Sequence, residues 1–255
     1  MNRHASSYPQ FAAQLSGSSF ASHEITLIRT AYDEASVLFA GAVRGSGRSF
    51  VDHVIGTASG TLLGGGDATA VAASLLHAAY EMGDFGGWRA ASSRRNRTKI
   101  SSRFGPEVED IVYRYHEMGW GPEVAQRVLD EIDNLSCRDR RVVLIRVANA
   151  LDDVLDGALV ISNKESLGEY SRETLDVVGA IAQRIAEPDL VECLDKVFKL
   201  RPPEIRQELI LGRVSSRVLL PRSARTNLTT LLVRRAARFW KQFRRCVRAT
   251  WSRPK

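Results

Sequence analysis

Two histidines and a glutamate stand at spacings that could do chemistry together. His77 and Glu81 lie four residues apart in the apolar run 75–85, which predicts an imidazole and a carboxylate side by side on one helix face. A second histidine, His53, lies upstream. The carboxylate could act as a base, and guanidinium groups could bind an anionic ligand. The arginines that we expect to contact such a ligand are Arg44, Arg48 and Arg97.

Four short motifs follow one another along the chain. They are Arg44-x-x-Gly47-x-x-Phe50-x-x-His53, Leu75-Leu76-His77-Ala78-x-x-Glu81, Phe104-Gly105-x-Glu107-Val108-x-x-Ile111-Val112 and Arg146-Val147-Ala148-Asn149-Ala150-Leu151-Asp152. In this order and at these separations they resemble the hydrolase domain of the RelA/SpoT-type alarmone hydrolases, a branch of the HD phosphohydrolase superfamily. The resemblance covers residues 20 to 160 or so.

The resemblance implies an all-helical fold and a divalent metal, typically manganese, held by two histidines and two aspartates. It also implies an acidic pair that handles water and a basic residue that helps to hold a guanine nucleotide. Carried over by position, it makes His53 and His77 the histidine ligands. Glu81 becomes the first member of the acidic pair, with a catalytic role, and Arg44 becomes the nucleotide-contacting residue.

Three positions depart from the family pattern. Ala78 stands where the HD aspartate belongs, Met82 where the second acid belongs, and Asn149 where the last metal-binding aspartate belongs. Manganese and magnesium favour carboxylate oxygens, so the loss of two carboxylates should weaken their binding severely. The remaining donors would be His53, His77 and, weakly, the amide of Asn149.

A metal could still bind if other acids took over as ligands. Asp152 and Asp153 follow Asn149 by three and four residues and share its helix face, and Asp84 is a further candidate. An imidazole-rich site of this kind would suit zinc better than manganese. Without a metal, phosphate-ester hydrolysis loses both its Lewis acid and its activated water.

We therefore expect a degenerate, alarmone-hydrolase-like site that binds a nucleotide or related phosphate compound with little or no manganese-dependent hydrolysis. One alternative is an active metal-dependent phosphohydrolase with rearranged ligands, and another is a membrane-associated or partner-associated scaffold. Each histidine alone could be structural, and Glu81 could simply form a surface ion pair. The functional interpretation therefore depends on the rings of His53 and His77 meeting in one cleft.

Apolar residues recur at helical spacing almost throughout the chain, and strand-like alternation is nearly absent. This pattern predicts an all-α fold, an irregular multi-helix bundle, in residues 1–215, and the resemblance implies that the bundle is of the HD type. Gly64-Gly65-Gly66-Asp67 predicts a turn that ends in a helix N-cap. The expected helices span residues 22–42, 50–63, 67–82, 105–118, 136–160, 170–186, 188–199 and 202–215.

Charge is distributed unevenly along the chain. The net charge is +7, yet residues 222–255 contain eleven lysines and arginines, and no acidic residue follows Glu208. Residues 216–255 are therefore predicted to be a linker followed by a basic amphipathic C-terminal helix. Its segment 228–251 could lie on an anionic membrane surface, dock on the protein's own core or, with less support, bind nucleic acid.

Other features of the composition favour a cytoplasmic protein, with peripheral membrane attachment as an alternative. No apolar run approaches the roughly 20 residues of a membrane span, and the first residues do not resemble an export signal. Cys137, Cys193 and Cys246 are far apart and form no C-x-x-C pair, which argues against disulfides and a cysteine-bound zinc.

Overall fold

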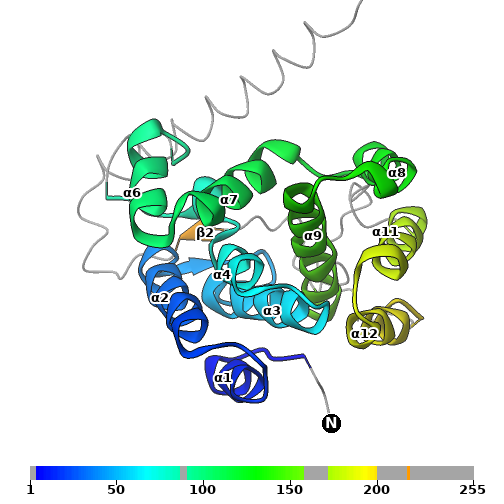
Figure 1. Ribbon diagram of the computed structural model, residues 1–255, viewed down its shortest axis with the longest axis horizontal. Helices are drawn as coiled ribbons and strands as arrows, with labels where there is room; N and C mark the ends of the chain where they lie inside the picture. Colours follow the sequence, from blue (N-terminus) through cyan, green and yellow to red (C-terminus); the bar gives the residue numbers. More distant parts are fainter. Residues whose placement is uncertain (1–3, 87–90, 158–171, 200–216, 219–255) are drawn as a thin grey trace, which may run out of the picture.

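The computed structural model describes residues 4–86, 91–157, 172–199 and 217–218 of the 255-residue chain. In these ranges it is all-α, as the sequence predicts, apart from one pair of two-residue strands (Figure 1). Its elements are α1 (Tyr8–Ser16), α2 (Ser22–Leu38), β1 (Ala42–Val43), α3 (Phe50–Leu63), α4 (Ala68–Leu76), α5 (Ala79–Met82), α6 (Arg94–Phe104), α7 (Pro106–Met118), α8 (Pro122–Asp130), the 3-10 turn η1 (Ile132–Asn134), α9 (Cys137–Leu155), α11 (Arg172–Ile185), α12 (Pro188–Lys199) and β2 (Arg217–Val218).

Two apolar clusters share the interior. One gathers buried side chains of α2, α3, α4 and α7, and the other gathers those of α8, α9, α11 and α12. Helix α3 lies between them and is buried on nearly every side, with ten of its fourteen residues inaccessible. It packs along α9, and this contact joins the two halves of the molecule (Figure 1).

Small residues let α3 and α9 approach closely. A Cβ atom at Gly56 would meet Asp152 Oδ1 at 1.8 Å, and one at Gly60 would meet the Ala148 Cβ at 2.9 Å. The α3 backbone therefore touches α9 where any larger residue would separate the helices. This contact sets the distance between the candidate site residues on the two helices.

Side-chain caps fix the starts of the helices that carry the site. Ser49 accepts a hydrogen bond from the Asp52 backbone N–H at 3.0 Å and begins α3. Asp67 accepts from the Ala70 N–H and begins α4, as the sequence predicts. Ser136 accepts from the Asp139 N–H and begins α9. Such caps satisfy N–H groups that have no partner within the helix.

The expected continuous helix over 67–82 is wrong. Helix α4 ends at Leu76, residues 77–78 form a turn, and α5 begins at Ala79. The break is local, since the backbone N–H groups of Glu81 and Met82 both bond to the Ala78 carbonyl. The run is apolar and largely buried on both sides of the turn, so its hydrophobic pattern carries no signal of the interruption.

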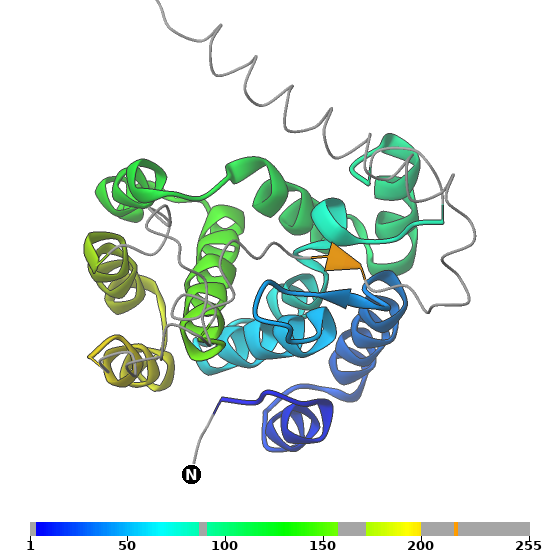
Figure 2. The same cartoon turned by 180° about the vertical axis from the view of Figure 1, so that it is seen from behind.

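Three helices occur where none was expected: α1, α6 and α8. The strand pair is antiparallel and joins Ala42 to Val218 and Val43 to Arg217 (Figure 2). Residues 217–218 thus pair with β1, although they fall in the predicted linker. The expected helix 202–215 and the basic helix 228–251 lie outside the described residues. Among the described helices, none is long and apolar enough to cross a bilayer.

Candidate functional site

The two histidines of the family pattern meet inside the molecule. His53 lies in the first turn of α3, and His77 follows the end of α4. Their ring centroids are 5.2 Å apart in an edge-to-face arrangement, and only 2% and 4% of the two residues is exposed. Phe50 packs against the outer side of His53, and Tyr115 of α7 packs against His77. The juxtaposition on which the sequence interpretation depends is therefore present.

Both imidazoles are held in a defined orientation. His53 Nδ1 lies 2.7 Å from Asp152 Oδ2, and His77 Nδ1 lies 2.7 Å from the Ser74 carbonyl oxygen. Burial lowers the pKa of both rings well below the usual range, helped at His53 by Arg44 and at His77 by His53. Each ring is therefore neutral. Because the partner oxygens only accept, Nδ1 donates in both rings and Nε2 keeps the lone pair.

Asp152 on α9 forms the centre of the polar network. Both of its oxygens accept hydrogen bonds at 2.9 Å from Nη1 of Arg48, and Oδ2 also accepts from His53. Its side chain has no exposed surface. Burial raises the pKa of Asp152, and the Arg48 guanidinium opposes this shift. The pairing with Arg48 is what permits a carboxylate at this depth.

A second arginine neutralises the next acids along α9. Arg44 forms an ion pair with Asp153, and its Nε lies 3.4 Å from Asp156. Asn149 donates to Asp153 at 2.8 Å, and Ser46 donates to Asp156 at 2.6 Å. The loop between β1 and α3 therefore reaches across to α9 and binds its acidic end.

The network contains a third histidine, His4, which lies beside Asp152 and was not predicted from the sequence. Its Nε2 lies 3.9 Å from Asp152 Oδ1, and burial lowers its pKa. The neighbouring Ala5 N–H donates to the buried Ser59 hydroxyl, which holds the N-terminal segment against α3. Nothing in the local sequence around His4 predicts this contact, because its partners lie more than fifty residues away.

Two of the other predicted residues, Glu81 and Arg97, form no hydrogen bond, ion pair or ring contact with the histidine pair. Glu81 is exposed on α5, after the turn that separates it from α4. Arg97 on α6 donates to both oxygens of Glu109, at 2.6 and 3.0 Å, and lies over the Tyr113 ring. Asn149 does reach the site, through Asp153 and through a hydrogen bond to His53.

The carboxylates near His53 are candidate metal ligands. One ligand atom each of His53, Asp152 and Asp153 lies within 4.8 Å of the other two. Each carboxylate, however, already accepts hydrogen bonds from a guanidinium group. Manganese prefers about six ligands, mostly oxygen, and this set offers few that are not engaged. As arranged, these residues do not fit a manganese ion.

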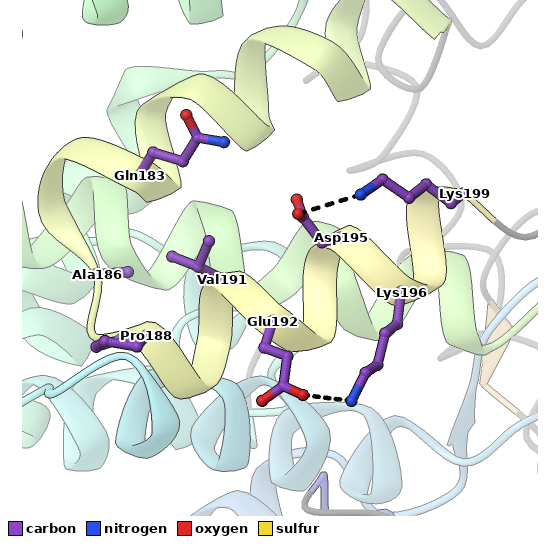
Figure 3. Close-up of a pocket in the computed structure, with 8 residues that line it drawn as sticks. All are labelled: Gln183, Ala186, Pro188, Val191, Glu192, Asp195, Lys196 and Lys199. Atoms are coloured by element: carbon purple, nitrogen blue, oxygen red, sulfur yellow. Dashed lines mark hydrogen bonds and ion pairs between the residues drawn. The ribbon is translucent and has the colours of Figure 1, made fainter.

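A surface groove of about 560 Å³ lies elsewhere, along α11 and α12 (Figure 3). Its charged side chains pair along α12, Glu192 with Lys196 and Asp195 with Lys199. None of the predicted site residues lines it. The candidate site is therefore the histidine, aspartate and arginine network between α3, α4 and α9.

Comparison with known proteins identifies a matching family and two similar proteins. A family model of the HD domain matches residues 31–186. A probable GTP pyrophosphokinase of Mycobacterium leprae (strain TN) is 26% identical over 200 residues, which are 76% of this chain. The chain spans 24% of the length of that relative. A metazoan ortholog of SpoT, described as hydrolysing ppGpp, aligns with 71% of this chain and 97% of its own, at 18% identity and a TM-score of 0.42.

Proposed function

Because the chain belongs to the HD domain family, we propose that it is an alarmone-hydrolase-like HD protein with a degenerate metal site. In this proposal it binds a nucleotide or related phosphate compound, with little or no manganese-dependent hydrolysis. The family match and the mycobacterial relative support the RelA/SpoT-like part of the prediction.

The pairing of arginines with the α9 aspartates carries the proposal. Both positions of the family pattern that hold a metal-binding carboxylate have lost it, Ala78 and Asn149. The two acids nearest to His53, Asp152 and Asp153, are neutralised by Arg48 and Arg44. Two guanidinium groups thus supply positive charge where the resemblance implies a divalent metal. A fixed guanidinium cannot generate a hydroxide nucleophile as a metal-bound water can, so binding is favoured over hydrolysis.

Anion binding is compatible with this network. Arg48 donates to Asp152 and to the Asp52 carbonyl oxygen, yet its side chain is 18% exposed. A guanidinium has five N–H groups, so donors remain for a ligand that approaches from solvent. The neutral rings of His53 and His77 add no negative charge that would repel a phosphate.

A binding and turnover assay tests the proposal. Chelator-treated protein is supplied with manganese or zinc and incubated with guanosine tetraphosphate and a panel of nucleotides. We expect measurable binding of at least one of these compounds and no release of phosphate or pyrophosphate above that of the buffer. Rapid metal-dependent turnover would contradict the absence of hydrolysis. Failure of every compound to bind would contradict the ligand-binding function.

A second candidate function is a phosphohydrolase with rearranged metal ligands. The grouping of His53, Asp152 and Asp153 favours it, because three donors of this type are typical of a zinc site with one open position. Binding would require both guanidinium groups to leave their aspartates. Stoichiometric zinc in the wild-type protein, lost in Asp153→Asn, would support this candidate over the first.

The basic C-terminal segment suggests a third class of function. We propose that residues 228–251, which lie outside the described residues, attach the protein to an anionic membrane surface, with nucleic acid a weaker alternative. Sedimentation with anionic vesicles compares the full chain with a variant that lacks residues 222–255. We expect the truncated form to lose most of its vesicle binding. Equal binding by both forms would eliminate the segment as an anchor.

A further inference from the structure

An arginine next to the histidine pair forms no ion pair with any acidic side chain of the described residues. Arg146 lies on α9, and its guanidinium carbon is 3.6 Å from the centroid of the Tyr115 ring and 5.8 Å from that of Trp120. One Nη donates to the Tyr115 carbonyl oxygen at 2.5 Å. No carboxylate of the described residues forms an ion pair with it. Its positive charge is therefore not balanced locally.

Two buried N–H groups in the same place lack acceptors. Arg146 Nε and Trp120 Nε1 are inaccessible to solvent and have no hydrogen-bond partner among the described residues. Buried donors in folded proteins are nearly always satisfied by protein, water or a ligand. Two unsatisfied donors beside an unbalanced positive charge indicate an acceptor that carries negative charge.

Tyr115 connects this place to the histidine pair. Its ring contacts His77 on one side, with centroids 4.9 Å apart, and Arg146 on the other. Burial raises the pKa of Tyr115 to about 12, with Asp153 and Glu81 adding to the shift. Its hydroxyl therefore keeps its proton at neutral pH. Among described residues no hydrogen bond from this hydroxyl is present, so it is a third available donor.

The backbone beside Trp120 is not closely packed. Trp120 lies between Gly119 and Gly121 in the connection from α7 to α8. A Cβ atom at either glycine would meet nothing within 4 Å, and Gly119 has a φ of +60°, which favours glycine. The indole Nε1 itself is buried, so an acceptor would reach it only if this connection moved.

We propose that Arg146, Trp120 and Tyr115 form an anion subsite that binds a phosphate or pyrophosphate group of the ligand. This inference rests on the proposed ligand-binding function and assigns part of the contact to residues outside the family motif ligands. The planar guanidinium, held against an aromatic ring, presents its N–H groups in a fixed direction toward phosphate oxygens. Because all three side chains offer hydrogen-bond donors, the set favours an anion, which accepts hydrogen bonds, over a cation.

Titration with inorganic pyrophosphate, GDP and uncharged guanosine tests the subsite, with calorimetry and tryptophan fluorescence as readouts. Arg146→Gln should weaken pyrophosphate and GDP binding by about tenfold to a hundredfold, the range of a charge-assisted hydrogen bond. It should leave guanosine binding unchanged. Trp120→Phe should weaken both anions by about threefold, because one neutral donor is lost. Arg138→Gln is the matched control, since Arg138 lies on the same helix and already faces Asp110.

The outcomes separate the two proposals. If GDP binds equally well to the wild type and to Arg146→Gln, the subsite is wrong and the proposed function stands. If the wild type binds neither pyrophosphate nor GDP, the subsite is wrong, whereas the proposed function is wrong only if guanosine tetraphosphate and the rest of the nucleotide panel also fail to bind. Should Arg146→Gln fail to fold, Arg146→Lys keeps the charge but loses the planar donor set. It should then bind pyrophosphate more weakly than the wild type, and unchanged binding would overturn the subsite.

Discussion

Arginines at two places along α9 have different partners. At its C-terminal end, Asp152 and Asp153 are buried and paired with arginines from the loop before α3. Two turns earlier, Arg146 lies against the rings of Tyr115 and Trp120 and pairs with no acidic side chain in the part of the chain that the structure describes. In the first region, arginine neutralises the protein's own carboxylates. In the second its charge is available to a ligand, so the same residue type supports structure in one place and recognition in the other.

Replacing the arginine in each region should produce the largest contrast. Arg48→Gln leaves the fully buried carboxylate of Asp152 without its main partner, which should cost about 3 to 5 kcal/mol of unfolding free energy. Arg146→Gln leaves no buried charge behind and should cost about 1 kcal/mol. Urea unfolding in the presence of a chelator measures both. Similar losses in the two variants would show that the regions do not differ in this way.

The close approach of α3 and α9 can be broken without changing any charge. In Gly56→Ala the new methyl group would collide with Asp152 Oδ1, and such overpacking should cost about 1 to 3 kcal/mol. The control is Gly179→Ala in α11, where nothing lies within 4 Å of the added Cβ. This change should stabilise the protein by about 0.5 to 1 kcal/mol, because alanine favours helix. Thermal unfolding of both variants should therefore shift in opposite directions.

Acidification should act through the buried histidines, His4 and His53 beside Asp152 and His77 beside Tyr115. His4, His53 and His77 have pKa values lowered from 6.5 by burial, so below pH 6.5 the unfolded chain binds more protons than the folded one. Stability should thus fall as the pH drops from 7.5 toward about 5. The raised pKa of Asp152 has the opposite sign and acts nearer its ordinary value of 3.8.

Chemical denaturation across this pH range, with chelator present, checks the expectation. His4→Gln should reduce the slope of stability against pH, since His4 is one of the groups that must remain neutral. A stability that is constant between pH 7.5 and pH 5 would contradict the buried, neutral state of the three rings.

The helical spacing of apolar residues was sufficient to predict the all-helical fold. The meeting of His53 with His77 was predicted from the resemblance of the ordered motifs to the RelA/SpoT-type hydrolases, and the structure confirms it. Helices α1, α6 and α8 were not predicted because their apolar signal is short or weak. In α6, only Asn96, Ile100 and Phe104 are buried, in an otherwise strongly polar run.

Long-range partners could not be read from local patterns. Arg44 was assigned to a ligand from its position in the family pattern and Arg48 from its residue type, whereas their acidic partners lie more than a hundred residues away. His4 and Arg97 show the same limit, since their roles depend on Asp152 and Glu109. Asp152 and Asp153 were named as substitute ligands from helical spacing, and they do lie beside His53.

A manganese titration with calorimetry as the readout tests the central claim most directly. The chelator-stripped wild type is compared with a variant that carries both Ala78→Asp and Asn149→Asp. The account predicts no stoichiometric manganese binding by the wild type, and at least tenfold tighter binding by the variant, because two carboxylate ligands are restored. One tightly bound manganese ion per wild-type chain would contradict the claim that arginines have taken the place of the metal.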